Sequence, residues 1–231
     1  MKSLGNDIVA LRSVDKQRTS QFRFYSKILS SSEQEFYHQP QFAEMPFENY
    51  VWLLWSVKES VYKFHKRAFP NLVFSPTKII IQKIKLPLVH LINKSEDIQW
   101  ENTGNDKELY SGKVIYESKI FYFQSKINKD WITTVVNDDE KFHNVFWGIQ
   151  SIDNAGYYYQ SKAARTLLLK KINLFFPGDL HVGKTPIGYP VILKGIQNMH
   201  IRVSLAHHGH FVAYSFILDS EHKKNIGIIR V

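Results

Sequence analysis

Apolar residues recur along the chain with two different periods, and these periods predict its helices and strands. Residues 47–66 are predicted as a long helix, because apolar side chains recur there every three or four residues. These residues are Val51, Leu54, Trp55 and Tyr62. Pro70 ends this helix, since proline cannot continue one. Residues 157–176 are predicted as a second long helix.

Strand-like runs fill most of the remaining chain. In the run 77–86, Ile79 and Ile81 face opposite to Ile80 and Gln82, which is the alternation expected of a strand. The predicted strand runs are 5–11, 77–86, 112–124, 130–138, 144–152, 200–218 and 226–231. The run 200–218 turns at His208–Gly209, and the polar segment 92–108 is predicted as a loop or hairpin tip.

Two short helices are expected between the first strand and the first long helix. Residues 21–29 form an amphipathic pattern, and Ser32 followed by Glu35 predicts a capping box for a helix in 30–38. The order is therefore strand, helices, strands, helix, strands. This order predicts an α+β fold rather than alternating βαβ units. Each half has one long helix with antiparallel strands, and no low-complexity linker separates the halves.

Composition narrows the class of protein. With 231 residues and 44% apolar content, the chain can bury one sizeable core or two small ones packed together. It has no cysteine, which excludes disulfides, thiolate nucleophiles and cysteine-based zinc sites. Asp7 interrupts the short apolar run near the N-terminus, so no signal peptide is expected, and "YVWLLWSV" is too short for a membrane span. We expect a cytoplasmic protein.

The charge balance points to an anionic partner. Lys and Arg number 30 against 21 Asp and Glu, which gives a net charge of +9. Such a chain suits nucleic acid, a phosphorylated cofactor, an acidic protein or a membrane surface. The positive charge is spread along the sequence, so a well-solvated surface explains it nearly as well.

The stretch "WSVKESVYK" places a carboxylate, Glu59, among aromatic residues on one helical face. Lys63 follows Glu59 by four residues, so a surface ion pair is one interpretation. The tryptophans at 52 and 55 favour a second interpretation, in which the carboxylate is partly desolvated and binds Mg²⁺. Asp7, early in the first strand, is either a turn residue or a second carboxylate of the same kind.

Histidines and a shaped loop near the C-terminus are candidates for phosphate binding. His207, His208 and His210 lie near a predicted strand turn, but neighbouring histidines on a strand point to opposite faces and cannot easily share a zinc ion. Phosphate recognition and a solvated turn both remain open for them. The upstream stretch "GKTPIGYP" adds Lys184 as a phosphate contact.

Taken in order, these stretches resemble the motifs of the 4′-phosphopantetheinyl transferase superfamily. "GNDIVAL" matches its Gly-x-Asp motif, and "WSVKESVYK" matches Trp-(Ser/Ala)-x-Lys-Glu-(Ser/Ala)-x-x-Lys at every defined position. "GYP" matches its Gly-x-Pro loop, and "SLAHHG" matches part of its Ser-His strand motif. The segment from about Gln82 to Gln150 has no counterpart in these motifs.

The resemblance implies a role for each matched residue. Asp7 and Glu59 would hold Mg²⁺, and Glu59 would also take the proton of an attacking serine, directly or through water. Lys63 would contact the pyrophosphate of coenzyme A. His207 and His208 would also contact its phosphates. On the helix before the Gly-x-Pro loop, Arg165 resembles the arginine that meets the 3′-phosphate in the larger members of the family.

Three positions depart from the family pattern. Val9 stands where some larger members have a further carboxylate, so the metal would keep an extra water. Ala206 replaces the serine before the motif histidine, which removes one hydroxyl contact to phosphate. Tyr189 stands where many relatives have a basic residue inside Gly-x-Pro, and Lys184 is expected to substitute for it.

The resemblance implies a Mg²⁺-dependent transferase of the holo-acyl-carrier-protein synthase type. It would move 4′-phosphopantetheine from coenzyme A to a serine of an acidic acyl or peptidyl carrier protein, in fatty-acid, polyketide or peptide synthesis. Mn²⁺ would suit the same oxygen ligands. Neither nucleic acid nor a membrane is expected as a partner.

The length and order of the motifs imply two fused, similar halves. Residues 1–105 would carry the metal motifs and residues 106–231 the coenzyme A motifs, as a pseudo-dimeric monomer with one active site between the halves. Two alternatives stay open at this point. One is a relative that binds coenzyme A but has lost transfer, and the other is a basic nucleic-acid-binding module with aromatic strands.

Overall fold

The computed structural model describes residues 3–88, 99–102, 106–219 and 222 of the chain. Its α-helices are α1 (Lys16–Thr19), α2 (Phe22–Tyr25), α3 (Ser31–Tyr37), α4 (Phe47–Lys66) and α5 (Tyr157–Ile172). The strands are β1 (Leu4–Ala10), β2 (Ile80–Lys85), β3 (Gln99–Glu101), β4 (Tyr110–Tyr116), β5 (Lys119–Ile127), β6 (Trp131–Asn137), β7 (Val145–Ser151), β8 (Leu180–Lys184), β9 (Pro190–Lys194), β10 (Gln197–Asn198), β11 (Arg202–His208) and β12 (Phe211–Ile217). The predicted α+β class is confirmed.

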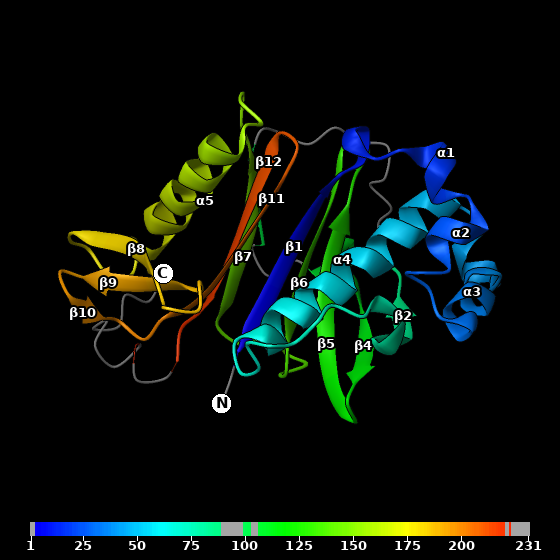
Figure 1. The fold of residues 1–231 in the computed structure, drawn as a ribbon, viewed down its shortest axis with the longest axis horizontal. Coiled ribbons are helices and arrows are strands. Elements are labelled where there is room, and N and C mark those ends of the chain that lie inside the picture. Colours follow the sequence, from blue (N-terminus) through cyan, green and yellow to red (C-terminus); the bar gives the residue numbers. More distant parts are fainter. Residues whose placement is uncertain (1–2, 89–98, 103–105, 220–221, 223–231) are drawn as a thin grey trace.

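The first sheet has the strand order β1-β6-β5-β4-β2, and its pairings are antiparallel. Helix α4 packs across it and fills the larger core, in which Val51, Leu54 and Val57 of the helix have no exposed surface. Every residue of β1 and of β6 is buried, because these strands lie near the middle of the molecule and are covered on both faces (Figure 1). Trp55 and Tyr62 are only partly buried, so the stripe that they share with Glu59 lies at the edge of the core.

The second sheet has the order β11-β12-β7-β3, again with antiparallel pairings, and α5 packs on β11 and β12. A small sheet of β8, β9 and β10 extends beside it. Leu167 and Leu168 of α5 and Val203 and Val212 of the sheet belong to one apolar cluster. This second core is separate from the one under α4.

The two larger sheets meet along β1 and β11. The backbone N–H of Asn6 donates to Ser204 Oγ at 3.3 Å, and the N–H of Ala10 donates to His208 Nδ1 at 3.2 Å. A third apolar cluster, which includes Ile8 and Ala206, fills the space between the sheets. As a result, α4 and α5 lie on either side of the β1–β11 junction (Figure 1).

The sheets share part of their connectivity. In the first, β1 pairs with β6 and precedes α4; in the second, β7 pairs with β12 and precedes α5. The division at residue 105 stays a prediction. In sequence, β4, β5 and β6 follow it and join the sheet of β1, whereas β3 precedes it and pairs with β7 of the second sheet. That the halves form a pseudo-dimer stays a prediction.

Two local predictions were wrong. The capping box is formed by Ser30 and Glu33, two residues before the predicted pair, because the Glu33 carboxylate is also needed by a buried lysine. The predicted run 112–124 is two strands joined at Glu117 and Ser118, which both have positive φ angles of 49° and 61°. The predicted strand 226–231 lies outside the described residues.

None of the described helices combines the length and apolar character needed to cross a membrane.

Candidate functional site

A glycine sets the distance between β1 and α4. A Cβ atom on Gly5 would overlap the backbone carbonyl oxygen of Ser60 and lie 2.9 Å from the backbone nitrogen of Phe64. Only glycine therefore allows the strand to lie this close to the helix. Asp7 is two residues further along β1. Since side chains two residues apart on a strand point to the same face, the Asp7 side chain also faces α4.

Asp7 and Glu59 converge on the ammonium group of Lys63. Lys63 Nζ lies 2.9 Å from Asp7 Oδ1 and 3.2 Å from Glu59 Oε1. The Asp7 side chain is 6% exposed, whereas those of Lys63 and Glu59 are 26% and 29% exposed. The ion pair between Glu59 and Lys63, one interpretation of the sequence, is thus formed, but it includes a third group that is distant in sequence.

The charges of Asp7, Glu59 and Lys63 do not balance one another. Burial raises the pKa of Asp7 to about 6, Lys63 acts against this shift, and the Glu59 charge adds to it. Burial acts to lower the pKa of Lys63, but the charges of Asp7 and Glu59 outweigh it and the pKa is raised. Two carboxylates share one ammonium, so the group carries excess negative charge in a partly buried place.

One buried oxygen indicates what could complete the group. Asp7 Oδ2 is buried and has no hydrogen-bond partner. A divalent cation that prefers oxygen ligands would satisfy this atom and balance the second carboxylate. Asp7 and Glu59 therefore fit a Mg²⁺ site. No cluster of three or more His, Asp or Glu residues occurs among the described residues, so such an ion would keep several waters.

The lysine next to Glu59 has a different environment. Lys58 is completely buried and donates to Glu33 Oε2 at 2.6 Å and to the carbonyl oxygen of Ile28 at 2.7 Å. Glu33 Oε1 accepts the N–H of Ile81 at 2.8 Å. This network joins α4 to α3 and β2, so Lys58 of the helix motif holds the helix in place and does not face the site.

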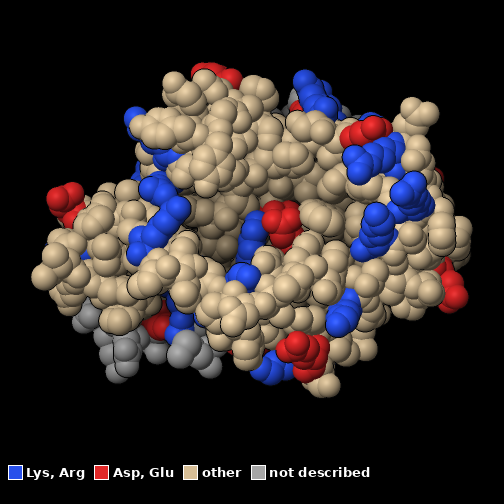
Figure 2. Space-filling view, viewed as in Figure 1, with Lys and Arg blue, Asp and Glu red and all other residues tan. Residues whose placement is uncertain are grey.

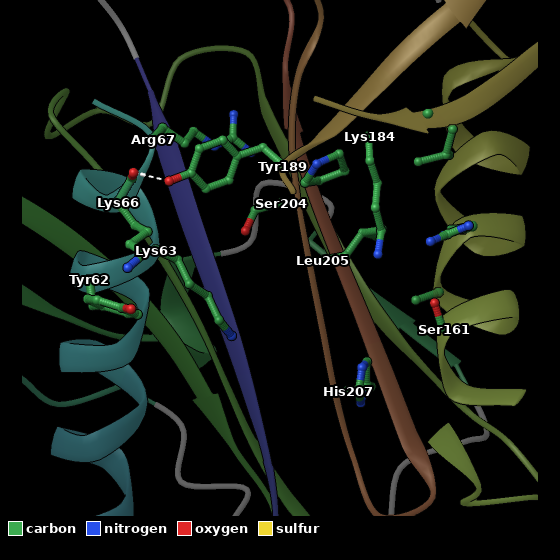
Figure 3. A pocket seen from close by; sticks show the side chains of 15 residues that line it. Tyr62, Lys63, Lys66, Arg67, Ser161, Lys184, Tyr189, Ser204, Leu205 and His207 are labelled. Carbon is green, nitrogen blue, oxygen red and sulfur yellow. Dashed lines mark hydrogen bonds between the residues drawn. The ribbon is translucent and has the colours of Figure 1, made fainter. Parts of the chain in front are cut away.

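Next to the three charges, a cavity of about 240 Å³ opens between α4, α5, the small sheet and β11 (Figure 3). Its described lining residues are Tyr62, Lys63, Lys66, Arg67, Ser161, Ala164, Arg165, Val182, Gly183, Lys184, Tyr189, Pro190, Ser204, Leu205 and His207. This lining contains five Lys and Arg residues and no Asp or Glu. Such a cavity suits an anionic ligand with several charges.

The structure brings some of the predicted phosphate contacts together. Lys63, Arg165, Lys184 and His207 line the cavity, although they come from four different elements. His208 is not among the lining residues, because it points to the other face of β11 and its Nδ1 accepts the Ala10 N–H. Burial lowers the pKa of the His207 imidazole, and Lys63 and His208 add to this shift.

The three departures from the family pattern also have clear locations. Val9 is buried in the core under α4, and Ala206 lies in the apolar cluster between the sheets rather than in the cavity. The hydroxyl that lines the cavity from β11 belongs to Ser204. Tyr189 lines the cavity, and its hydroxyl donates to the backbone carbonyl of Lys66 at the end of α4 (Figure 3).

Sequence reasoning gave no role to four polar residues of the cavity: Lys66, Arg67, Ser161 and Ser204. Arg67 had a usable signal, because it follows Lys63 by four residues and so lies on the same side of α4. Ser161 and Ser204 had none, since a lone serine on a helix or strand does not indicate a cavity.

Comparison with known families gives one match. The family model described as the 4′-phosphopantetheinyl transferase superfamily matches residues 3–115. The matched part includes β1, α4 and all three converging charges. The resemblance stated from the motifs is thereby confirmed for this part of the chain. Among curated proteins, no significant match is found.

Proposed function

On the premise that residues 3–115 place this chain in the 4′-phosphopantetheinyl transferase superfamily, we propose that it transfers 4′-phosphopantetheine from coenzyme A to a carrier-protein serine. One observation carries the proposal. Two carboxylates from distant parts of the chain contact Lys63, and this lysine also lines a cavity whose lining contains five Lys and Arg residues and no Asp or Glu. Transfer from a diphosphate donor needs a metal-binding pair and a place for several phosphates, and the two carboxylates next to the cationic cavity would supply both.

The reaction forms one P–O bond and breaks another. The serine hydroxyl attacks the β-phosphorus of coenzyme A, and 3′,5′-ADP leaves with the electron pair of the broken P–O bond. The serine proton passes to Glu59, directly or through water, because this carboxylate is partly exposed at the cavity mouth. Lys63 supplies positive charge beside the diphosphate, as cations do in other phosphoryl transfers.

Asp7 and Glu59 would hold the Mg²⁺ ion. When bound, the ion neutralises diphosphate charge that would otherwise repel the nucleophile. The buried and unpaired Oδ2 of Asp7 supports this assignment, because nothing else among the described residues satisfies it. Gly5 contributes by allowing Asp7 to approach α4.

The remaining donor phosphates fit the cations of the cavity. Arg165 of α5, Lys184 of β8 and His207 of β11 surround it from three sides, and their charges or N–H groups suit phosphate oxygens. His208 is further from the cavity; we propose that it chiefly keeps β11 in register with β1 through the Ala10 N–H.

The acceptor would be an acidic carrier protein. The chain has a net charge of +9, and Figure 2 shows Lys and Arg side chains on both sides of the hollow at the centre of one face. Charges around such a hollow chiefly speed the encounter with a partner of opposite charge. We propose that the enzyme acts as a monomer, since α4, which packs on the first sheet, and α5 and β11, which belong to the second, line the same cavity.

A mass measurement tests the proposal. The protein is incubated with apo carrier proteins, coenzyme A and Mg²⁺, and each carrier is weighed. We expect a mass gain equal to phosphopantetheine, which Glu59→Ala abolishes. Glu44→Ala is the matched control, because Glu44 is exposed and lies outside the cavity lining.

Two other results would refute transfer. Tight binding of coenzyme A without a mass gain in any carrier would identify a relative that has lost activity. Salt-sensitive binding of oligonucleotides without affinity for coenzyme A would identify a nucleic-acid-binding module.

A further inference from the structure

A second cavity, of about 600 Å³, lies where α4 ends close to the start of β1 (Figure 1). The proposed reaction gives it no role, and its described lining shares only Arg67 with the lining of the first cavity. Its volume is within the range of small-molecule sites, roughly 300–1,000 Å³. The described lining residues are Ser3, Phe64, His65, Arg67, Ala68, Phe69, Lys119, Ile120, Phe121, Asp138 and Arg202.

Part of this lining is strongly apolar. Phe64, Phe69, Ile120 and Phe121 bring three aromatic rings and one branched aliphatic chain to a single cavity. Phe69 and Ile120 are 49% and 46% exposed. Large apolar side chains that stay exposed in one place often mark a site for an apolar ligand or partner. The cavity therefore offers apolar surface that the fold itself does not cover.

The rest of the lining is mainly cationic. It contains Arg67, Lys119 and Arg202, and one acid, Asp138. Within the described ranges, no carboxylate lies within ion-pair distance of any of these three cations. Burial lowers the pKa of Arg67 to about 10; Tyr189 acts against this shift, and the nearby charge of Arg202 adds to it. Two neighbouring guanidinium groups, one of them partly buried, would be stabilised by an anion.

A buried histidine adds a polar group to the same wall. His65 lines the cavity and is 3% exposed, and its Nε2 atom has no hydrogen-bond partner. Its ring lies 4.9 Å from that of Phe121 and 5.0 Å from that of Tyr116. Burial lowers the pKa of His65, and Lys119 adds to this shift while Glu117 acts against it, so the imidazole is neutral near pH 7 and carries one N–H. Polar groups buried this deeply normally have a partner, so His65 indicates a polar ligand.

We propose that the second cavity binds a fatty-acid anion, which is an alkyl chain that ends in one carboxylate. The carboxylate lies between Arg67 and Arg202, because guanidinium forks match carboxylate oxygens in two-pronged hydrogen bonding. The alkyl chain packs on the phenylalanine rings, and the His65 imidazole is a further hydrogen-bonding group of the wall. This inference goes beyond the proposed transfer and does not depend on it.

The two kinds of lining together select this chemistry. A neutral lipid would cover the apolar part but leave the cations without an anion. A small anion such as phosphate would pair with the cations but leave the rings exposed. A membrane surface would contact the exposed Phe69 and Ile120, but it would not fill an enclosed volume of about 600 Å³. A single amphipathic anion satisfies all parts of the lining.

Three probes test the chemistry of the ligand. Calorimetry on the full chain is carried out with decanoate, with 1-decanol and with acetate, each below the concentration at which it aggregates. We expect one decanoate to bind per chain, at least about tenfold more tightly than 1-decanol, which is the usual value of hydrogen bonds to a charged group. Acetate, which has the charge without the chain, should show no measurable binding.

Two variants and two controls place the ligand in the second cavity. Ala68→Trp should abolish decanoate binding by filling the cavity, and Ala43→Trp is its control, since Ala43 is exposed and outside the described lining. Arg202→Gln should weaken decanoate binding roughly tenfold. Arg165→Gln should leave it unchanged, because Arg165 lines only the first cavity.

His65→Phe separates ligand binding from fold stability. The substitution removes the unpaired nitrogen, so the variant should unfold at a higher temperature than the wild type and yet bind decanoate a few-fold more weakly. A loss of fold could not give this combination. Thermal unfolding of every variant identifies any that is not folded.

The possible results are distinct. The inference would be overturned if the folded wild type bound no decanoate, if 1-decanol bound equally well, or if Arg165→Gln weakened binding as much as Arg202→Gln. Flotation with phosphatidylglycerol vesicles, in the absence of decanoate binding, would identify a membrane contact and would also overturn it. Decanoate binding at this site by a protein that modifies no carrier would support the inference and refute the transferase. Carrier modification without decanoate binding would do the reverse.

Discussion

Helix α4 carries two lysine–carboxylate groups five residues apart, and their environments differ in one decisive respect. Around Lys58, every charged atom has partners: its ammonium meets Glu33 and a carbonyl, and both Glu33 oxygens accept backbone N–H groups. Around Lys63, two carboxylates share one ammonium, and Asp7 Oδ2 has no partner. The first group is electrically balanced and fully buried, whereas the second is neither.

This difference distinguishes a group that stabilises the fold from a group that can bind ligands. A buried ion pair is tolerated when hydrogen bonds satisfy all of its atoms, and removing one partner is then expensive. A group with excess charge and an unpaired oxygen is instead ready to bind a cation and an anionic ligand. On the same helix, Lys58 therefore stabilises the packing of α4, whereas Lys63 is available to a ligand. Substitutions at each group can break or sharpen this distinction.

The largest effect is expected from Lys58→Met. Glu33 would be left buried and charged without its partner, so we expect the free energy of unfolding to fall by about 3–5 kcal/mol. Urea unfolding followed by circular dichroism measures this loss. The double variant Lys58→Met/Glu33→Leu should regain much of the stability, because no unpaired charge remains. A loss below about 1 kcal/mol in the single variant would mean that the pair does not hold the helix.

A smaller effect is expected from Gly5→Ala. The added methyl group overlaps the Ser60 carbonyl, so β1 must move away from α4, at a cost of about 1–3 kcal/mol. Because Asp7 moves with β1 while Lys58 and Glu33 do not, transfer activity should fall far more than stability does. Carrier mass gain and urea unfolding, measured on the same preparation, compare the two losses.

Gly112→Ala in β4 is the matched control for Gly5→Ala. A Cβ there would also overlap a backbone carbonyl, that of Lys83, but at a place that contributes nothing to the cavity. It should cost stability and leave the activity of the folded fraction intact. Equal activity losses in the two glycine variants would show that β1 has no special role in positioning Asp7.

The two lysine groups also show how far sequence reasoning reached. Helix α4 was predicted at its observed bounds because its apolar period is long and Pro70 stops it, and the motif singled out Glu59 and Lys63. The capping box was placed two residues late because the register of α3 depends on Glu33 reaching Lys58, a tertiary contact. No local pattern distinguishes a lysine that will be buried from one that will face a cavity.

The β4–β5 hairpin and the cavity are two further features that local sequence patterns did not predict. Glu117 and Ser118 adopt positive φ angles that neither residue favours, so the run 112–124 gave no sign of a turn. The cavity combines residues from α4, α5, β8 and β11, and only the family resemblance suggested that they would meet. Arg67 could have been found from its spacing to Lys63 on one helix.

Asp7→Asn should affect stability in the opposite direction from Lys58→Met. The folded pKa of Asp7, about 6, is above its unfolded value of 3.8, so its contribution to stability is present below pH 3.8 and is lost as the pH rises through 6. Without divalent cations at pH 7.5, Asp7→Asn should therefore raise the free energy of unfolding by about 1–2 kcal/mol and abolish transfer.

Urea unfolding in EDTA at pH 4 and pH 7.5 tests this sign. The gain of Asp7→Asn over the wild type should shrink towards pH 4, where the wild-type carboxyl is protonated. With Mg²⁺ added, only the wild type should become more stable, by mass action. A stability loss as large as that of Lys58→Met would show that the Asp7 group is as structural as the Lys58 group.

The smallest effect concerns a third polar residue of α4, His65, which is buried among aromatic rings and has an unpaired Nε2. Burial lowers its pKa below the usual 6.5, and Lys119 adds to this shift, so its contribution to stability is present above pH 6.5 and is lost as the pH falls. His65→Phe should raise the free energy of unfolding by about 1 kcal/mol at pH 7.5 and by more at pH 5.5. Thermal unfolding at both values measures the difference, and exposed His143→Phe is the control. If His65→Phe lost transfer activity at unchanged stability, His65 would belong with Lys63 rather than with Lys58, and burial alone would no longer separate the two kinds of group.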